Sequence, residues 1–543
     1  MRDPLHELRS VVNDSIAALR DGAGDASPTL ERPPRPELGD YSTNAAMLLA
    51  PSRGEQPRSV AEALSEELEG RLEGTAERIE VAGPGFINLF LADRWHRDGV
   101  AAILAAGGEL GAPAGPGGET INVEFVSANP TGPLTAAGGR HAAYGDSLAR
   151  VLELAGHGVV REYYLNDSGG QVRLFAESIA ARMRGDEPPE NGYEGEYVAD
   201  LARELAARGI GSDDLDALEV EGVVPMREAI AATLERFEVR FDAWSSERAL
   251  YEAGAVDAVL AELRERGHVY ESEGATWLRT SEFGDDKDRV VLRSDGEPTY
   301  LAGDIAYHRD KLERGAEQLI DVLGADHHGY VARMRAALAA LDLDPDRFEA
   351  LIMQLVHVIE RGERAQMSKR RGEFVTLDEL IDDIGTDAAR FLMLQRSHDT
   401  TVDLDLALAR SQSQDNPVYY VQYAHARIAS ILRKAGDERV ARALEAVGST
   451  ASVAAEPAER ALIKRLLELP GEVRDAAELR APHRLCAYSM ATAADFHGFY
   501  RDCQVVGAEG DGVEDARLAV CVATRRVIAR TLDLLGVSAP EQM

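Results

Sequence analysis

Cysteine is scarce in this chain of 543 residues. The three thiols, Cys486, Cys503 and Cys521, stand on apolar helical patterns near the C-terminal end, and their spacing matches neither a disulfide framework nor a zinc site. Long apolar runs are also missing: no segment has the roughly 18 apolar residues of a membrane helix, and the first residues lack the apolar core of a secretory signal. The sequence therefore predicts a soluble, cytoplasmic protein with buried thiols and no membrane partner.

Lysine is rare as well, with five residues among the 59 basic side chains. The remaining cations are arginines, while 94 acidic residues bring the net charge to -35 and the isoelectric point to about 4.8. A nucleic-acid binder normally carries a basic footprint, so this balance argues against such a partner. The argument is not decisive, because binding depends on local patches and not on the total charge.

The length of the chain implies several domains, since a single core stops growing at about 250–300 residues. Residues 1–110 combine helical periodicity with strand-like runs around 83–85, which indicates a small α/β module with an accessory role. From 119 to 395 strand and helix patterns alternate, as in an α/β domain with a parallel sheet, except for a helical insertion at about 185–288. Residues 401–543 are almost wholly helical and predict a bundle.

The apolar patterns also locate individual elements. Strands of the α/β domain are predicted at 121–126, 159–165, 290–293, 319–323 and 352–358. Helices of the bundle are predicted at 418–434, 459–477, 483–499 and 515–535. A bundle of this kind can simply pack against its neighbour, so its periodicity assigns it no function.

The stretch 123–146 is the most informative part of the chain. A β-branched and aromatic run at 123–126 ends at 129–133, where two prolines and a glycine exclude strand and helix, and a helix pattern follows the small residues at 136–139. A strand, a tight loop and a helix N-terminus in this order leave unpaired N–H groups and a helix dipole that favour a phosphate. Most joints of this kind bind nothing, so the pattern alone leaves both interpretations open.

A second stretch, 364–373, is a cationic loop with a glycine that precedes another strand-like run and helix. Its Lys369 is a compact point charge, which suits the phosphates of a leaving group, although basic loops are usually only solvated. Together the two stretches resemble the class I aminoacyl-tRNA synthetases, in which a HIGH-type tetrapeptide and a KMSKS-type loop hold ATP. Met367, Ser368 and Lys369 keep the core of the second motif.

Longer strings narrow this resemblance to the arginyl-tRNA synthetases. The strings that look like signatures of that family stand at 39–41, 123–133, 162–167, 324–330, 416–427 and 539–543. Because they extend from near the start of the chain to its end, the resemblance covers essentially the whole sequence. It also answers the objection from net charge, since these enzymes contact tRNA through local basic and polar surfaces.

The resemblance implies an α/β fold and a two-step reaction. The expected fold is a Rossmann-like nucleotide-binding catalytic domain with a helical insertion, a small N-terminal α/β domain that contacts tRNA, and an all-α C-terminal bundle that binds the anticodon. The expected reaction joins L-arginine to tRNA(Arg) through arginyl-adenylate, with ATP as substrate and Mg²⁺ accompanying it. No tightly bound metal is expected, and the protein is expected to be a monomer.

The family's arginine site carries over onto acids and polar residues of this chain. The matching positions are Glu124, Asn129, Glu247, Tyr300, Asp304 and His327, of which Glu247 aligns more loosely. Glu124 and Asn129 match the positions that hold the backbone end of arginine, while Tyr300 and Asp304 match the pair beside the guanidinium. A planar guanidinium with five donors suits such a pair of carboxylates and an aromatic face. The alternative is that these are structural acids at strand ends.

The nucleotide and tRNA contacts are implied in the same way. ATP is expected to meet Pro130, Thr131, Gly132, Pro133, Thr135, Gly138, Gly324, Asp326, His328, Met367, Ser368 and Lys369, and Lys369 is expected to stabilise the departing pyrophosphate. For tRNA the expected contacts are Tyr419, Tyr423 and Met543, although both tyrosines also fit simple packing.

The chain departs from the family at the HIGH-type motif. Where the family has His-x-Gly-His, residues 135–138 read Thr-Ala-Ala-Gly. Thr135 offers a hydroxyl, and Arg140 or His141, one helical turn further on, offers charge, so these three residues are predicted to act catalytically with Lys369. The alternatives are an inactive paralogue that binds tRNA or arginine, and an adenylate-forming transferase with another acceptor. The retained lysine and arginine pocket favour the active enzyme.

Overall fold

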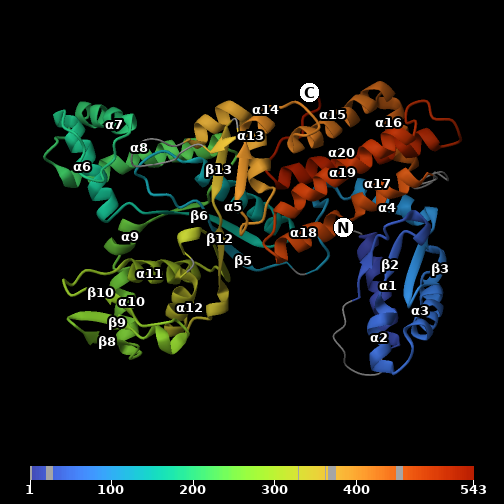
Figure 1. Cartoon of the computed structure of the whole chain (residues 1–543), viewed down its shortest axis with the longest axis horizontal. Helices are drawn as coiled ribbons and strands as arrows, with labels where there is room; N and C mark the ends of the chain where they lie inside the picture. Colours follow the sequence, from blue (N-terminus) through green and yellow to red (C-terminus); the bar gives the residue numbers. More distant parts are fainter. Residues whose placement is uncertain are drawn as a thin grey trace.

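A computed structural model describes residues 3–19, 28–115, 117–327, 329–360, 362–364, 375–447 and 456–543. The predicted fold class is confirmed: a mixed α/β body carries a parallel sheet, with an α/β block at the N-terminal end and a helical bundle at the C-terminal end (Figure 1). None of the helices in these ranges is long and apolar enough to cross a membrane.

The N-terminal block is a four-stranded antiparallel sheet covered by helices. The strand order is β1 (Leu30–Glu31), β2 (Tyr41–Thr43), β4 (Phe86–Leu91) and β3 (Ala76–Ala82). The helices are α1 (Pro4–Ala18), α2 (Ala45–Arg53), α3 (Pro57–Arg71) and α4 (Asp93–Ala105). The Asp3 side chain caps α1 by accepting from the Leu5 and His6 amides, which satisfies donors that a helix start leaves unpaired.

A five-stranded parallel sheet forms the centre of the molecule. Its order is β12 (Phe348–Met353), β11 (Gln318–Gly324), β5 (Thr120–Glu124), β6 (Gly158–Leu165) and β7 (Ala243–Ser246). The middle strand β5 is buried on both faces, with Ile121 and Val123 on one face and the polar Asn122 and Glu124 on the other. Because β6 and β11 lie on opposite sides of β5, the connections diverge at its carboxyl end, which is where α/β sheets of this kind bind ligands.

Helices cover this sheet and extend from it as two lobes (Figure 1). The helix α5 (Ala136–Leu154) follows β5 directly, and α11 (Tyr300–Glu313) and α12 (Tyr330–Ala340) flank β11. One lobe contains α6 (Gly170–Arg184), α7 (Glu196–Ala207) and α8 (Leu215–Arg236). The other contains α9 (Glu247–Glu252), α10 (Ala255–Glu265) and a small antiparallel sheet of β8 (Val269–Ser272), β9 (Ala275–Leu278) and β10 (Arg289–Leu292).

The predicted helical insertion at about 185–288 differs from the structure. That segment contains β7, which is the edge strand of the parallel sheet, and also β8 and β9. The predicted strand at 290–293 exists as β10, but it belongs to the antiparallel sheet of the lobe. These strands have only four residues each, so they carry too little periodicity to be distinguished from loops. The predicted strand at 352–358 divides into β12 and β13 (Val356–Glu360), and β13 joins β14 (Glu363–Arg364) and β15 (Val402–Asp405) in a separate three-stranded sheet.

The C-terminal part is helical, as predicted. It follows α13 (Leu377–Leu394) and α14 (Leu406–Arg410) and contains α15 (Pro417–Ala435), α16 (Asp437–Ala446), α17 (Pro457–Leu467), α18 (Leu469–Glu478), α19 (His483–Asp502) and α20 (Val513–Leu534). The predicted helix at 459–477 is in fact two helices, because α18 restarts with Pro470 in its first turn. The short helix α16 was not predicted.

Candidate active site

A cavity of about 410 Å³ opens at the carboxyl ends of β5 and β11. The structure brings together many of the residues predicted from the sequence in its wall: Glu124, Asn129, His141, Asp304, Gly324 and His327. The wall also contains residues that the sequence did not single out, among them Ser127, Tyr164, Tyr307, His308 and Asp321. The cavity therefore combines acids, aromatic rings and imidazoles at the position where parallel sheets bind ligands.

The chain leaves β5 through an unusual backbone conformation. Val126 and Ser127 have φ values of 69° and 39°, in a region that side-chain-bearing residues rarely adopt. Hydrogen bonds hold the turn: the Ser127 hydroxyl donates to Glu124 Oε1 at 2.8 Å and accepts from the Tyr164 amide at 3.1 Å. The turn therefore fixes the Glu124 carboxylate against the neighbouring strand β6 at the edge of the cavity.

A buried chain of charges lies beneath the cavity. Lys311 Nζ donates to Glu124 Oε2 at 2.5 Å and to Asp321 Oδ1 at 3.0 Å, and Asp321 Oδ2 meets His308 Nε2 at 2.8 Å. The other ring nitrogen of His308 lies 2.7 Å from the Asp304 carbonyl. Both partners of the imidazole are acceptors, so both nitrogens donate and the ring is cationic. Although burial opposes that charge, the Asp321 carboxylate raises the pKa of His308.

Among the residues that the structure describes, no cationic side chain pairs with the Asp304 carboxylate. The pKa of Asp304 is raised to about 7, chiefly by burial; the His308 charge lowers it, and the nearby carboxylates of Glu124 and Glu247 contribute to the rise. Asp304, His308 and Lys311 stand four and three residues apart, so they lie on one face of α11. This spacing can be read from the sequence, although the sequence motifs pointed only to Asp304. A carboxyl of this kind is suited to a cationic ligand that would stabilise its ionised form.

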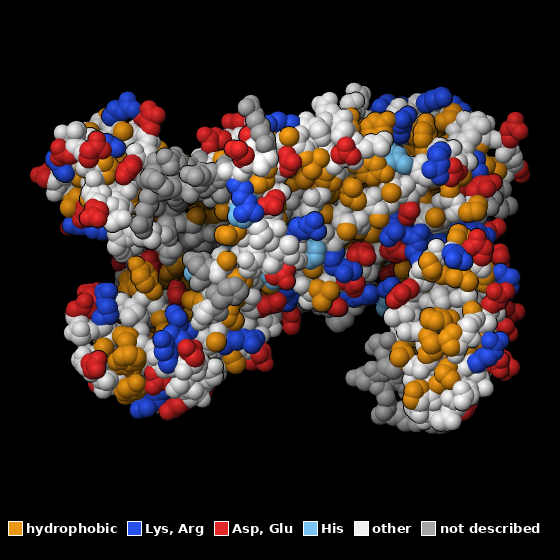
Figure 2. All heavy atoms as spheres, viewed as in Figure 1, with side chains coloured by type: hydrophobic (Ala, Val, Ile, Leu, Met, Phe, Trp, Pro, Cys, Tyr) orange, Lys and Arg blue, Asp and Glu red, His pale blue; other side chains and the backbone are white. Residues whose placement is uncertain are grey.

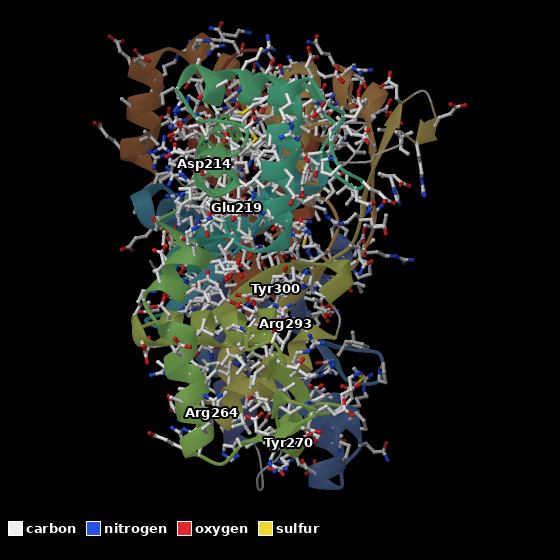
Figure 3. All side chains as sticks on the ribbon, turned by 90° about the vertical axis from the view of Figure 1, so that its left-hand side faces the viewer. Asp214, Glu219, Arg264, Tyr270, Arg293 and Tyr300 are labelled. Atoms are coloured by element: carbon white, nitrogen blue, oxygen red, sulfur yellow. The ribbon has the colours of Figure 1, made fainter. Side chains whose placement is uncertain are left out.

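Glu247 and Tyr300 line a second cavity of about 510 Å³ beside the first. Glu247 is buried at the start of α9 and accepts from the Ser168 hydroxyl at 2.8 Å, and burial raises its pKa. Tyr300 is 70% exposed and lies near Arg293, below Glu219 of α8 (Figure 3). The structure thus places these two predicted arginine contacts in the wall of one cavity, where Glu247 is buried and Tyr300 is exposed.

The loop that replaces the HIGH-type motif ends at the N-terminus of α5. Thr135 is the N-cap, and its hydroxyl accepts from the Gly138 amide at 3.4 Å. The Ala136 amide donates to the Val375 carbonyl at 3.0 Å, and the Leu377 amide donates to the Leu134 carbonyl at 2.8 Å. The chain that emerges from the cationic loop is therefore bonded to the start of α5, as the pairing of the two motifs requires.

Several predicted ATP contacts are only partly described. Met367, Ser368, Lys369 and His328 lie outside the described residues, and so does the side chain of Asp326. In the loop before α5, Pro130, Thr131 and Gly132 are buried and Pro133 is half-buried. The Thr131 carbonyl accepts from the Tyr197 hydroxyl at 2.9 Å, which ties this loop to the lobe of α6 to α8.

Arg140 occupies a different place from the one predicted. Its side chain is fully buried, and its guanidinium donates to the backbone carbonyls of Gln354, Ser397 and Thr400 at 2.7–2.8 Å. Arg140 is therefore a structural residue and not a contact of ATP. The next residue, His141, is the one that lines the cavity, because successive helical side chains point about 100° apart.

The predicted tRNA contacts lie on the bundle and at the end of the chain. Tyr419 and Tyr423 are half-buried on α15 with stacked rings 6.2 Å apart, and Arg427 donates to the Tyr423 hydroxyl at 2.7 Å. The Arg427 guanidinium also lies 5.1 Å from the ring of Tyr500, while Met543 is 54% exposed. Partly exposed aromatic rings beside an arginine are suited to stacking on unpaired bases.

Family models match three parts of the chain. Residues 6–91 match the arginyl tRNA synthetase N terminal domain, residues 212–429 match the class I (R) tRNA synthetase catalytic domain, and residues 421–543 match the DALR anticodon binding domain. With the parallel sheet and its cavity, these matches define the chain as a class I aminoacyl-tRNA synthetase.

Solved structures specify the family within that class. A putative arginyl tRNA synthetase from Campylobacter jejuni is 34% identical, with 83% of this chain and 100% of that chain covered and a TM-score of 0.77. The arginyl-tRNA synthetase of Thermus thermophilus is 26% identical over 99% of this chain and 100% of that one, with a TM-score of 0.79. The chain belongs to the arginyl-tRNA synthetase family. The Plasmodium falciparum enzyme, at 16% identity over 100% of both chains and a TM-score of 0.78, shares its fold.

Proposed function

We propose that this chain is an arginine–tRNA ligase that activates arginine in the cavity at the ends of β5 and β11. The arginine carboxylate attacks the α-phosphorus of ATP, which releases pyrophosphate and leaves arginyl-adenylate. The terminal ribose hydroxyl of tRNA(Arg) then takes the arginyl group and AMP departs. The observation that carries this assignment is the set of acids at the cavity, among which Asp304 has no cationic partner in the described part of the chain.

The distribution of charge favours a cationic substrate. His308 and Lys311 supply two positive charges that balance the carboxylates of Asp321 and Glu124. Asp304 and, in the adjoining cavity, Glu247 are left for the guanidinium, whose planar fork of five donors suits two carboxylates. We assign Glu124 and Asn129 to the α-amino end of arginine, because Lys311 and Ser127 hold the Glu124 carboxylate at the cavity.

Asn129 is held in place by two neighbouring amides. Its Nδ2 donates to Gln171 at 2.7 Å, and its Oδ1 accepts from Asn166 Nδ2 at 2.9 Å. Such fixed side chains reduce the entropy that is lost when a substrate is oriented for reaction. Tyr300 is at the open side of the pocket and is assigned to cover the guanidinium, while His327 lines the wall near Gly324.

The nucleotide contacts require no side-chain nucleophile. Adenylate formation depends on positioning and on stabilising charge at the phosphates. We assign the Gly138 amide, the Thr135 hydroxyl and His141 to the phosphates, in place of the family's histidines, and Lys369 to the departing pyrophosphate. The hydrogen bonds between 134–136 and 375–377 support this pairing, since they bring the end of the cationic loop to the start of α5.

Other features of the assignment also rest on the family resemblance. Mg²⁺ is proposed to accompany ATP, with phosphate oxygens as ligands. Residues 1–110 and the helical domain at 401–543 are proposed to contact tRNA, with Tyr419, Tyr423 and Met543 among the contacts. A monomeric state and a cytoplasmic location stay predictions.

Arginine-dependent exchange of pyrophosphate into ATP, measured with and without tRNA(Arg), tests this function. The expected result is exchange with arginine alone among the amino acids, and a loss of about 10²-fold in His141→Ala if the imidazole stabilises the phosphates. His6→Ala, an exposed histidine on α1, is the control and should exchange normally. Exchange with a different amino acid would refute the pocket assignment, and tRNA binding without any exchange would identify an inactive paralogue.

A further inference from the structure

Two adjacent tyrosines of β6 have contrasting hydroxyl groups. Side chains alternate along a strand, so Tyr163 and Tyr164 point to opposite faces. The Tyr163 hydroxyl donates to the Ala128 carbonyl at 2.8 Å. Tyr164 is only 6% exposed, and its hydroxyl is buried. This hydroxyl nevertheless has no hydrogen-bond partner in the part of the chain that the structure describes. A buried polar group without a partner costs stability, which indicates a partner that is not part of the folded chain.

The position of Tyr164 is fixed by its surroundings. Its amide donates to the Ser127 hydroxyl at 3.1 Å, and its ring stacks on Tyr307 with 4.3 Å between centroids. Tyr307 belongs to α11, the helix that also carries Asp304. The hydroxyl therefore has little freedom to find another partner by rotating.

The environment of this hydroxyl is shielded from water and contains several carboxylates. Tyr164 lines the arginine cavity together with Glu124 and Asp304. Burial raises its pKa far above the usual range, and the carboxylates of Glu247, Asp304 and Glu124 raise it further. The group is thus a neutral hydroxyl that is close to the acids of both cavities, and it is placed to meet a donor that enters with positive charge.

We propose that the Tyr164 hydroxyl is a specificity-determining contact for the guanidinium of arginine. This inference rests on the proposed arginine–tRNA ligase function. The hydroxyl oxygen accepts one guanidinium N–H, so the ligand supplies the partner that the described part of the chain does not. An ammonium group has three donors on a single nitrogen and cannot reach two carboxylates and a hydroxyl in one plane, whereas the guanidinium can.

The Tyr164→Phe variant tests the proposal without changing the shape of the core. Equilibrium dialysis with radiolabelled arginine should show a dissociation constant raised about tenfold, as expected for one lost hydrogen bond to a charged group. The KM for ATP should stay the same. The melting temperature of the free protein should stay equal or rise, because the variant removes a buried group that has no partner.

Tyr488→Phe is the matched control. Tyr488 is equally buried in the helical bundle, and its hydroxyl donates to the Arg465 carbonyl at 2.8 Å. This variant should lower the melting temperature and leave arginine binding unchanged, the reverse of the pattern expected for Tyr164→Phe. Wild-type affinity for arginine in Tyr164→Phe, or a lowered melting temperature of its free form, would overturn the proposal. Failure of the wild-type protein to bind arginine would instead overturn the ligase function itself.

Discussion

At the scale of single residues, Asp304 links the proposed arginine pocket to pH. Its pKa is about 7 in the folded protein and 3.8 for an aspartate in an unperturbed environment, so the folded state retains a proton that the unfolded state has lost between these values. Unfolding in this window therefore releases a proton, and stability falls as the pH rises toward 7. The cause is chiefly burial of the carboxylate, which the described part of the chain does not offset with an ion pair and which a bound guanidinium would offset.

Arginine affinity should consequently depend on pH. Because the guanidinium favours ionised Asp304, binding should release a proton below pH 7, and affinity should rise about tenfold per pH unit there and level off above pH 7. Asp304→Asn should remove this dependence, weaken arginine binding and raise the melting temperature at pH 8. Dialysis and thermal denaturation across this range measure both effects. Asp257→Asn, an exposed acid on α10, is the control, and a wild-type affinity that does not change with pH would contradict the assignment.

Part of the wall of the cavity at β5 and β11 was predictable at this scale, but the charges that support it were not. Glu124, Asn129 and Asp304 follow from long motif strings, and the structure gathers them in one cavity. Lys311 was missed because no motif includes it, and its role depends on Asp321, a residue on a different element. Arg140 and His141 were indistinguishable in the sequence, since adjacent helical residues with similar charge differ only in the direction in which they point.

At the scale of elements, the close contact between α5 and β5 positions the site. Gly145 of α5 lies against Phe125, and a methyl group at Gly145 would come within 2.1 Å of the Phe125 ring. Phe125 is itself fully buried under Phe241, with 4.5 Å between ring centroids. A larger residue would separate the helix that carries His141 from the strand that carries Glu124.

Gly145→Ala should therefore destabilise the protein. Overpacking of a tight core should lower the free energy of unfolding by about 1–3 kcal/mol, and activity should fall as the helix shifts. Gly70→Ala is the matched control, because Gly70 lies in α3 with nothing near its Cβ position, and there alanine should be neutral or stabilise by about 0.5–1 kcal/mol. Urea unfolding of both variants distinguishes them. Equal stability of Gly145→Ala and the wild type would show that α5 is free to move.

Strands and helices were predicted correctly where their hydrophobic patterns extend over many residues. The strands β5, β6 and β11 and the helices α15, α19 and α20 agree with their predicted positions within a few residues. The order of strands could not be predicted, because pairing depends on contacts between segments far apart in the sequence. Nor could the break within α13, where Gly385 has a φ of 79° in the middle of an apparently continuous helical pattern.

At the scale of the whole molecule, ion pairs connect the N-terminal block to the helical bundle. Lys464 of α17 donates to Asp40 Oδ1 at 2.9 Å, and Asp40 also accepts from the Leu91 amide at 2.8 Å. Although burial opposes ionisation, His96 and Lys464 hold the pKa of Asp40 well below its usual range. The two parts lie side by side, and the molecule is hollowed between the N-terminal block and the lobe of α9, α10 and β8 to β10 (Figures 1 and 2).

Breaking the ion pair between Asp40 and Lys464 should change the KM for tRNA more than the KM for arginine. Asp40→Asn leaves Lys464 buried without its partner and should destabilise the protein by about 3–5 kcal/mol. The KM for tRNA should rise if both parts contact the same tRNA, while the KM for arginine stays unchanged. Asp93→Asn, which removes an exposed partner of Arg460, should cost at most about 1 kcal/mol. If folded Asp40→Asn kept the wild-type KM for tRNA, the contact between the N-terminal block and the bundle would not contribute to tRNA recognition, and this prediction would be wrong.

The net charge of -35 argues against binding of a polyanion such as tRNA. The distribution of charged side chains over the surface explains why a negative total charge is compatible with tRNA as a ligand. On the face shown in Figure 2, lysine and arginine side chains are interspersed with acids over the whole surface. Local groups such as Arg427 between Tyr423 and Tyr500 combine one cation with aromatic rings. Total charge therefore says little about whether a surface of this kind offers local sites for a polyanion.

The most direct test of the account is aminoacylation of tRNA(Arg) by the purified full-length chain, with each standard amino acid supplied in turn. The account predicts ATP-dependent charging with arginine alone, despite the missing histidines at 135–138. Charging with another amino acid, or tRNA binding without any charging, would contradict it.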